Sequence, residues 1–426
     1  MAAANANDRE LNSWKEIANF LGVSERTAQK WEEERGLPIK RLPGVKGRVT
    51  TTAAALETWK KSNLKKIPWH ANVRFLRFYA GAATLLIAIL LGIQITRYFA
   101  GHRTGPPAQY QVESNALIVK DTHGKEVWRW LFERPFQASA YMNPSYEETS
   151  RKAWFGSLRL DKPDTNTLFV YYPAIADTKG SSLYSFSSTG QKEWDFIPGK
   201  EIEDGKGRYK PFFVITDFHV TPLTTLIRGG ERNKILITSH HFDQDPNQFA
   251  ILDDRGTLTA EYWHAGYLTH METADLNGDG IEEILLAGVN NGYHSVILLE
   301  LDPRNVQGAF QQEADDPLQL KDFPRGTEMR AVLFPRSCIA MKMQYNNLAQ
   351  LVATKDTVEI VTFERATPIL SAEIRYIMNR NLDLKDVQVS DEFIRVHREM
   401  ESHGELNHRY AEDDRKQLKK NVRRLR

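Results

Sequence analysis

An uncharged apolar stretch between Arg77 and Arg97 constrains the fold of this chain more than any other feature. The 19 residues between these two arginines, FYAGAATLLIAILLGIQIT, include no Asp, Glu, Lys or Arg. A helix of that length rises about 1.5 Å per residue and spans roughly 28 Å, close to the hydrocarbon thickness of a bilayer. We therefore predict one transmembrane helix over residues 78–97, with a buried core helix as the alternative.

The flanks of this stretch differ in their basic residues. Before it stand Lys60, Lys61, Lys65, Lys66, Arg74 and Arg77. After it come Arg97 and Arg103, and the next basic residue is Lys120. Because cytoplasmic flanks carry the excess of Lys and Arg, we predict a single-pass protein of the cell inner membrane. Its N-terminus is expected in the cytoplasm and its C-terminal domain in the periplasm, with residues 63–77 as a basic juxtamembrane linker.

Charge is distributed unevenly along the 426 residues, although the whole chain has a formal net charge of +1. Residues 1–77 contain 15 Lys/Arg and 8 Asp/Glu, a balance of +7, and the remainder has 41 − 47 = −6. A basic block on an acidic chain predicts a polyanionic partner at that end, either nucleic acid or anionic lipid. The single cysteine excludes an intramolecular disulfide framework.

Residues 11–62 are predicted to form short helices behind a disordered N-terminus, residues 1–10. Ser13 and Glu16 have the spacing of a capping box that begins the first helix. Gly22 makes a turn and Ser24 caps a second helix, SERTAQKWEEE. Arg26, Gln29 and Lys30 are spaced to face away from the first helix. The segment after Gly36 contains several Pro and Gly residues and predicts a β-ribbon wing, and a third helix is expected at about 52–62.

The stretch LNSWKEIANFLGVSERTAQKWEEERGLPIKR resembles the excisionase/MerR-like winged helix-turn-helix class. The resemblance implies DNA binding, in which Arg pairs with guanine, Gln with adenine, and Lys contacts phosphate. It assigns the contacts to the second helix and the wing: Arg26, Gln29, Lys30, Lys40, Arg41, Lys46 and Arg48. Glu32, Glu33 and Glu34 would repel phosphates and must point away from the DNA. A small protein-binding helical module is the alternative.

From about residue 108 the sequence becomes a series of short β-rich runs. Three units each contain an apolar strand, a polar turn with glycine and an aromatic strand, and the turn glycines are 66 residues apart: Gly124, Gly190 and Gly256. Each unit predicts a β-hairpin. Apolar strands between the hairpins predict an all-β, propeller-like domain over residues 108–389, with a β-sandwich pair as the alternative. Residues 390–426 are predicted to be a helical tail.

One loop of this region has oxygen-bearing side chains at alternate positions followed by glycine. The segment TADLNGDGIEEILLAG resembles an FG-GAP/VCBS propeller repeat, in which such loops bind Ca²⁺. The resemblance implies one calcium site with these ligands: Asp275, Asn277, Asp279, the carbonyl of Ile281, and Glu283. The alternative is a polar turn whose side chains bond only to their own backbone.

No catalytic motif is present, so the protein is not predicted to be an enzyme. Cys338 lies in an apolar run and is expected to be a buried small hydrophobic residue. The predicted fold class is multidomain: a small α winged helix-turn-helix domain, a transmembrane helix, and an all-β propeller-like domain with a helical tail. The predicted function is a membrane-anchored transcription regulator whose outer domain senses a protein or glycan. Signalling across one helix would require either a homodimer or a reorientation of the helix. The alternative is a membrane-anchored scaffold or adhesion protein.

Overall fold

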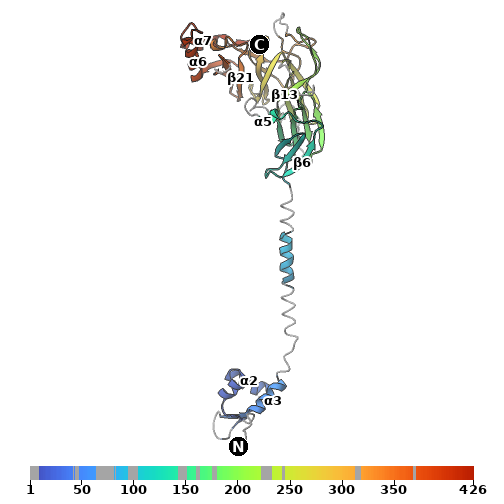
Figure 1. Cartoon of the computed structure of the whole chain (residues 1–426), viewed down its shortest axis with the longest axis vertical. Coiled ribbons are helices and arrows are strands. Elements are labelled where there is room, and N and C mark those ends of the chain that lie inside the picture. The colour runs from blue at the N-terminus through green and yellow to red at the C-terminus, as the bar shows by residue number, and fades with distance from the viewer. Residues whose placement is uncertain are drawn as a thin grey trace. The chain divides into compact units, whose positions relative to one another are not determined.

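A computed structural model shows two compact units, residues 1–102 and 103–426, which we call the N-terminal unit and the β-rich unit (Figure 1). The structure describes residues 9–41, 43, 48–63, 81, 83–94, 104–142, 151–159, 164–174, 180–221, 233–241, 245–311, 318–367 and 371–426. Over these residues the chain is mostly β-sheet with a few helices, which confirms the β-rich class of the larger unit.

Over residues 9–63, the described residues of the N-terminal unit form three helices and a small sheet around one apolar core. The helices are α1 (Trp14–Leu21), α2 (Glu25–Arg35) and α3 (Ala53–Asn63), and the antiparallel sheet has the order β1 (Glu10–Leu11), β3 (Val49–Thr52), β2 (Lys40–Arg41). Ile17, Ala28 and Leu56 are completely buried in the shared core. The predicted third helix is thus present, and it turns Leu56 and Trp59 inward.

Local capping chemistry fixes where α1 and α2 begin and end. The Ser13 hydroxyl accepts a hydrogen bond from the Glu16 amide at 3.3 Å, which confirms Ser13 as N-cap. The Glu16 carboxylate accepts from the Asn12 amide at 2.9 Å, one residue earlier than a capping box requires. Gly22 has a φ of 70°, a left-handed conformation that favours glycine and ends α1. Ser24 then caps α2 as predicted.

The predicted membrane-spanning architecture is not supported by the structure. Gly81 and residues 83–94 are helical with exposed side chains, and the rest of the predicted span and the linker 64–77 lie outside the described residues. Among the described residues, no helix is both long and apolar enough to cross a bilayer. The predicted arrangement, an excisionase/MerR-like head joined by one transmembrane helix to an FG-GAP/VCBS-like propeller, is therefore wrong. The predicted membrane location and orientation stay untested predictions.

The β-rich unit consists of successive antiparallel sheets whose strands follow one another along the chain. In sheet order, the first two sheets are β4 (Gln109–Glu113), β5 (Ala116–Lys120), β6 (Glu126–Leu131), and then β10 (Lys192–Phe196), β9 (Ser182–Phe186), β8 (Asn166–Tyr171), β7 (Ala153–Gly156). The next two are β11 (Ile202–Glu203), β12 (Arg208–Tyr209), and then β13 (Phe213–Thr221), β14 (Lys234–His241), β15 (Asn247–Leu252), β16 (Leu258–His264). The last two are β17 (Gly266–Ala274), β18 (Glu283–Asn290), β19 (Ser295–Leu301), β20 (Arg330–Phe334), β25 (Arg423–Arg424), and then β21 (Asn347–Ala353), β22 (Thr357–Arg365), β23 (Ser371–Asn379), β24 (Leu384–Val389). A short helix, α5 (Ser139–Met142), precedes β7. Over the described residues no closed barrel or propeller is detected, so the structure shows a multi-sheet β unit.

The three predicted hairpins are confirmed, and their turns share one hydrogen-bonding pattern. The turn glycines Gly124, Gly190 and Gly256 have φ values of 78°, 83° and 75°. Each amide donates at 3.0 Å to the carbonyl three residues earlier. The side-chain oxygen of that earlier residue, Asp or Ser, accepts from the amides on both sides of the glycine. The repeat seen in the sequence is therefore a repeat of backbone geometry.

Each of the later two turns is also packed against a tryptophan of the preceding hairpin. An ideal Cβ atom on Gly190 would lie 2.7 Å from the Trp128 ring, and one on Gly256 would lie 2.5 Å from the Trp194 ring. The Trp194 indole also donates to the carbonyl of Asp254 at 3.2 Å. Neighbouring sheets thus contact one another through the same pair of positions, hairpin tryptophan against hairpin glycine.

The C-terminal segment begins with two helices, α6 (Asp391–Ser402) and α7 (Glu412–Asn421), which lie beside each other at the end of the unit that carries β21 (Figure 1). The buried side chains Phe393, Val396 and Leu418 join the core under the β21–β24 sheet. The predicted helical tail, residues 390–426, is wrong after Asn421, where α7 ends. Arg423 and Arg424 pair instead with β20, because the unpaired edge of that strand offers backbone partners.

Candidate functional site

Helix α2 presents the three polar side chains that the sequence singled out for DNA contact. Ala28 faces the core, and Arg26, Gln29 and Lys30 are exposed. Over the described residues, Arg26 and Gln29 have no hydrogen-bond or ion-pair partner, so their donors are free to meet a base edge. The C-terminal end of α2 is fixed by the Trp59 indole, which donates to the Arg35 carbonyl at 2.9 Å.

The predicted wing is a two-stranded ribbon of β2 and β3, in which Arg41 pairs with Val49. Lys40, Arg41 and Arg48 are exposed, whereas Lys46 lies outside the described residues. The Arg41 guanidinium donates to the Glu32 carboxylate at 2.8 Å and so connects the ribbon to α2. The structure therefore places the two predicted contact elements side by side.

The acidic run on α2 is partly neutralised by these same cations. Glu32 pairs with Arg41, and Glu34 lies 3.5 Å from the ammonium of Lys30. The side chains of Lys30 and Arg41 are 65% and 68% exposed, and ion pairs at such positions contribute only about 0–1 kcal/mol. Because the pairs are weak, both cations can exchange a carboxylate for a phosphate at little cost.

The loop predicted to bind calcium connects β17 to β18 and is held by its own hydrogen bonds. Asp275 accepts from the amides of Gly278 at 2.7 Å and Gly280 at 3.0 Å. Asn277 accepts from the Asp279 amide at 2.7 Å, and its side-chain amide donates to Glu283 at 2.6 Å. These are the bonds expected of the polar-turn alternative. A carboxylate has about four acceptor positions, so the bonds leave capacity for a cation.

The fit of this loop to calcium is incomplete. Over the described residues, the loop's carboxylates do not form a group whose ligand atoms all lie within 4.8 Å of one another. Asp279 instead pairs with Arg304 at 3.2 Å, which occupies the carboxylate with a protein cation. Burial raises the pKa of Glu283, whose side chain is fully buried. Calcium at Asp275, Asn277, Asp279, Ile281 and Glu283 stays a prediction, and it requires Arg304 to be displaced.

Asp279→Asn is expected to weaken calcium binding, because it removes the charge of one ligand. Arg304→Gln is expected to strengthen it, because it removes the guanidinium that competes with calcium for Asp279. Calcium at 100 times its dissociation constant would stabilise the native chain by about 2.7 kcal/mol. Thermal melts with and without calcium measure the shift. Asp356→Asn, in the exposed turn between β21 and β22, is the control. An identical melt of the native chain with calcium and with chelator would remove the site.

A cleft of about 680 Å³ lies beside β11, β12 and β16 of the β-rich unit. Its lining combines charged and aromatic side chains. Lys200 contacts Glu261 at 2.6 Å and lies 4.8 Å from the centre of the Phe323 ring. Lys321 contacts Glu203 at 2.6 Å. A concave surface with several polar groups and an aromatic wall is the usual form of a ligand site.

Sequence reasoning missed a cluster of side chains at the C-terminal end of the chain. Cys338, His397, His408 and Asp414 come together, although they are spread over 77 positions. Cys338 is half-buried and packs against the core, so it is less buried than predicted. The sequence offered one signal for this cluster, a single cysteine together with two histidines and an aspartate near the tail. Their spacings match no compact metal-binding motif.

Comparison with known proteins identifies no family for this chain. No family model matches it, and no curated protein matches it. Solved structures that share similarity include a eukaryotic initiation factor (9% identity, 68% of this chain, 65% of that chain, TM-score 0.30). Others are the V. cholerae biofilm matrix protein Bap1 (14%, 57% and 39%, 0.26) and BBS1N in complex with ARL6DN (11%, 68% and 83%, 0.29). The chain thus spans about two thirds of the initiation factor and well under half of Bap1.

Proposed function

We propose that this protein is a DNA-binding regulator whose N-terminal unit binds duplex DNA. The observation that carries the proposal is the exposure of Arg26 and Gln29 on the face of α2 that the core leaves free, where neither has a partner among the residues that the structure describes. Arg reads guanine and Gln reads adenine through paired hydrogen bonds in the major groove, which admits one helix. The net charge of +7 over residues 1–77 favours a polyanion at this end of the chain.

The basic ribbon supplies the contacts that position the helix. Lys40, Arg41 and Arg48 are exposed beside α2 and would bind phosphates, together with Lys46. Such contacts fix the orientation of a protein on the duplex but carry no sequence information. In this arrangement Arg41 leaves Glu32 for a phosphate when DNA is bound.

We further propose that the β-rich unit is a propeller-like array that senses a protein or glycan. Support comes from the successive four-stranded sheets and from the repeated contact of a hairpin tryptophan with the next hairpin's glycine. The cleft beside β11, β12 and β16 is the candidate ligand site. Binding there would regulate DNA binding by the same chain.

The proposal is tested by selecting duplexes from a random pool with the full chain and measuring affinity for the selected sequence. Arg26→Ala is expected to lower affinity by about 1–3 kcal/mol, roughly 5- to 150-fold, and to relax the preference at one base pair. Lys40→Ala should weaken binding to all sequences alike. Lys416→Ala, an exposed lysine of α7, is the charge-matched control and should change nothing.

The scaffold alternative makes the opposite prediction. The pool would yield no preferred sequence, and Arg26→Ala would bind DNA as weakly and as indifferently as the native chain. That result would remove the regulatory role and leave the β-rich unit as the functional part.

A further inference from the structure

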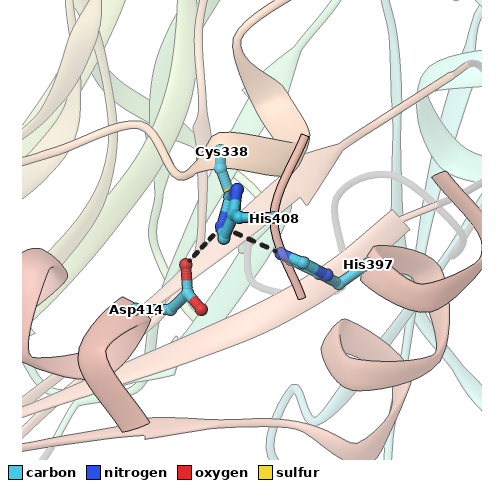
Figure 2. Close-up of side chains that lie close together, drawn as sticks. All are labelled: Cys338, His397, His408 and Asp414. Atoms are coloured by element: carbon cyan, nitrogen blue, oxygen red, sulfur yellow. Dashed lines mark hydrogen bonds and ion pairs between the residues drawn. The ribbon is translucent and has the colours of Figure 1, made fainter. Parts of the chain in front are cut away.

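Four side chains of types that can ligate a metal converge where the C-terminal helices meet the segment after β20 (Figure 2). Cys338 begins the single-turn helix η3 (Cys338–Ala340), which follows β20. His397 lies on α6, His408 on the segment between the two helices, and Asp414 in the first turn of α7. Their sulfur, nitrogen and oxygen ligand atoms all lie within 4.8 Å of one another.

The distances inside the cluster fit one shared ion. Nε2 of His408 lies 3.3 Å from Nε2 of His397 and 2.8 Å from Oδ1 of Asp414. In a tetrahedral site with bonds of about 2.0–2.1 Å, neighbouring ligand atoms are about 3.3 Å apart. A proton on Nε2 of His408 can be directed at Asp414 or at His397, but not at both. A cation at the centre of the cluster satisfies every ligand atom at once.

The ligand types select the metal. Thiolate and imidazole ligands suit zinc and disfavour magnesium or calcium, which bind oxygen. Four protein ligands close the coordination sphere, as in structural rather than catalytic zinc sites. We propose that Cys338, His397, His408 and Asp414 together bind one Zn²⁺ ion.

Neighbouring groups already orient two of the ligands. The Ala411 amide donates to Oδ2 of Asp414 at 2.9 Å, which leaves Oδ1 for the metal. His397 is fully buried on the inner face of α6, with the Tyr410 ring 5.7 Å from its own. Burial raises the pKa of the Cys338 thiol to about 11, so zinc binding must release the thiol proton.

The ion would join parts of the chain that are far apart in sequence. Cys338 belongs to the segment after β20, whereas His397 and Asp414 lie on α6 and α7 and His408 lies on the segment between them. Zinc would therefore connect α6 and α7 to the segment that follows β20, within the β-rich unit. Since the ligands come together only in the folded chain, binding adds to folding stability.

The test measures metal in the full chain, purified without chelator and dialysed against Zn²⁺. We expect about one zinc per chain, and a lower melting temperature once chelator removes it. Cys338→Ser and His397→Gln are expected to lose the zinc. His403→Gln, an exposed histidine at the end of the same helix, is the matched control and should keep it.

Cobalt provides an independent readout that needs no variant. Because Cys338 is the only cysteine, a thiolate-to-Co²⁺ charge-transfer band in the native chain can come from no other residue of the protein. We expect this band to appear with Co²⁺ and to disappear when Zn²⁺ is added. Less than about 0.1 zinc per chain together with no cobalt band would overturn the proposal. Neither readout depends on DNA binding.

Discussion

Gly256→Ala is expected to lower the free energy of unfolding of the β-rich unit by about 2–5 kcal/mol. Two costs combine at this position. The φ of 75° places a side chain in the left-handed region, which costs about 1–2 kcal/mol. The new Cβ would also lie 2.5 Å from the Trp194 ring, so the turn or the indole must move. Chemical denaturation followed by circular dichroism measures the loss.

Gly124→Ala separates the two costs. This glycine has the same turn and a φ of 78°, but nothing lies within 4 Å of its Cβ position. Its replacement should cost only the strain of about 1–2 kcal/mol. Gly190→Ala, whose Cβ would lie 2.7 Å from the Trp128 ring, should resemble Gly256→Ala. Equal losses of unfolding free energy in all three variants would show that the contacts of Gly190 with Trp128 and of Gly256 with Trp194 do not require a glycine.

Arg330→Met is expected to destabilise the β-rich unit by about 3–5 kcal/mol at neutral pH. Arg330 on β20 forms an ion pair with Glu300 on β19, and the Glu300 side chain is completely buried. Removing the guanidinium leaves a carboxylate charge without compensation in the sheet. Adding Glu300→Gln should recover much of the loss, because the uncompensated charge is then gone. Chemical denaturation of the native chain, the single variant and the double variant measures the loss of stability and its recovery.

The pH dependence of this variant follows from the same charge. Burial already raises the pKa of Glu300 while Arg330 lowers it, so the variant's pKa must rise further. A carboxyl group whose pKa is higher in the folded state loses stability as pH rises through that value. The deficit of Arg330→Met should therefore be smaller at acidic than at alkaline pH. A pH-independent deficit, or no recovery in the double variant, would contradict this account.

Features determined by neighbouring residues were predictable from the sequence. The caps of α1 and α2 depend on Ser13, Ser24 and Gly22, each within a few residues of the bonds it makes. The hairpin turns likewise follow from a glycine and an oxygen side chain three positions before it. The exposure of Arg26 and Gln29 followed from helical spacing alone.

Features made by distant residues were not predictable. The contacts of Trp128 with Gly190 and of Trp194 with Gly256 each join positions 62 residues apart. The cluster of Cys338 with the C-terminal histidines has no compact spacing. The ion pair of Arg304 with Asp279, which competes with calcium, joins the loop between β17 and β18 to a residue that follows β19. Each depends on how the sheets pack, which no local pattern encodes.

The pairing of β25 with β20 shows the same limit at the end of the chain. Residues 390–426 were predicted to be a helical tail, in part from the helical spacing of Leu418, Val422 and Leu425. The helix ends at Asn421, and the next residues form hydrogen bonds with a strand that is about 90 positions earlier in sequence. Tertiary contact overrides local periodicity here, because an open sheet edge satisfies backbone groups that a frayed helix end leaves exposed.

The salt dependence of DNA affinity in the full chain tests the proposed function most directly. Four or five phosphate contacts by the cations of α2 and the ribbon predict a slope of about −4 in log affinity against log salt. Affinity for the selected duplex should then fall about 250-fold between 50 and 200 mM salt. Affinity that is unmeasurable at 50 mM salt, or that does not change between the two concentrations, would contradict DNA binding by the N-terminal unit.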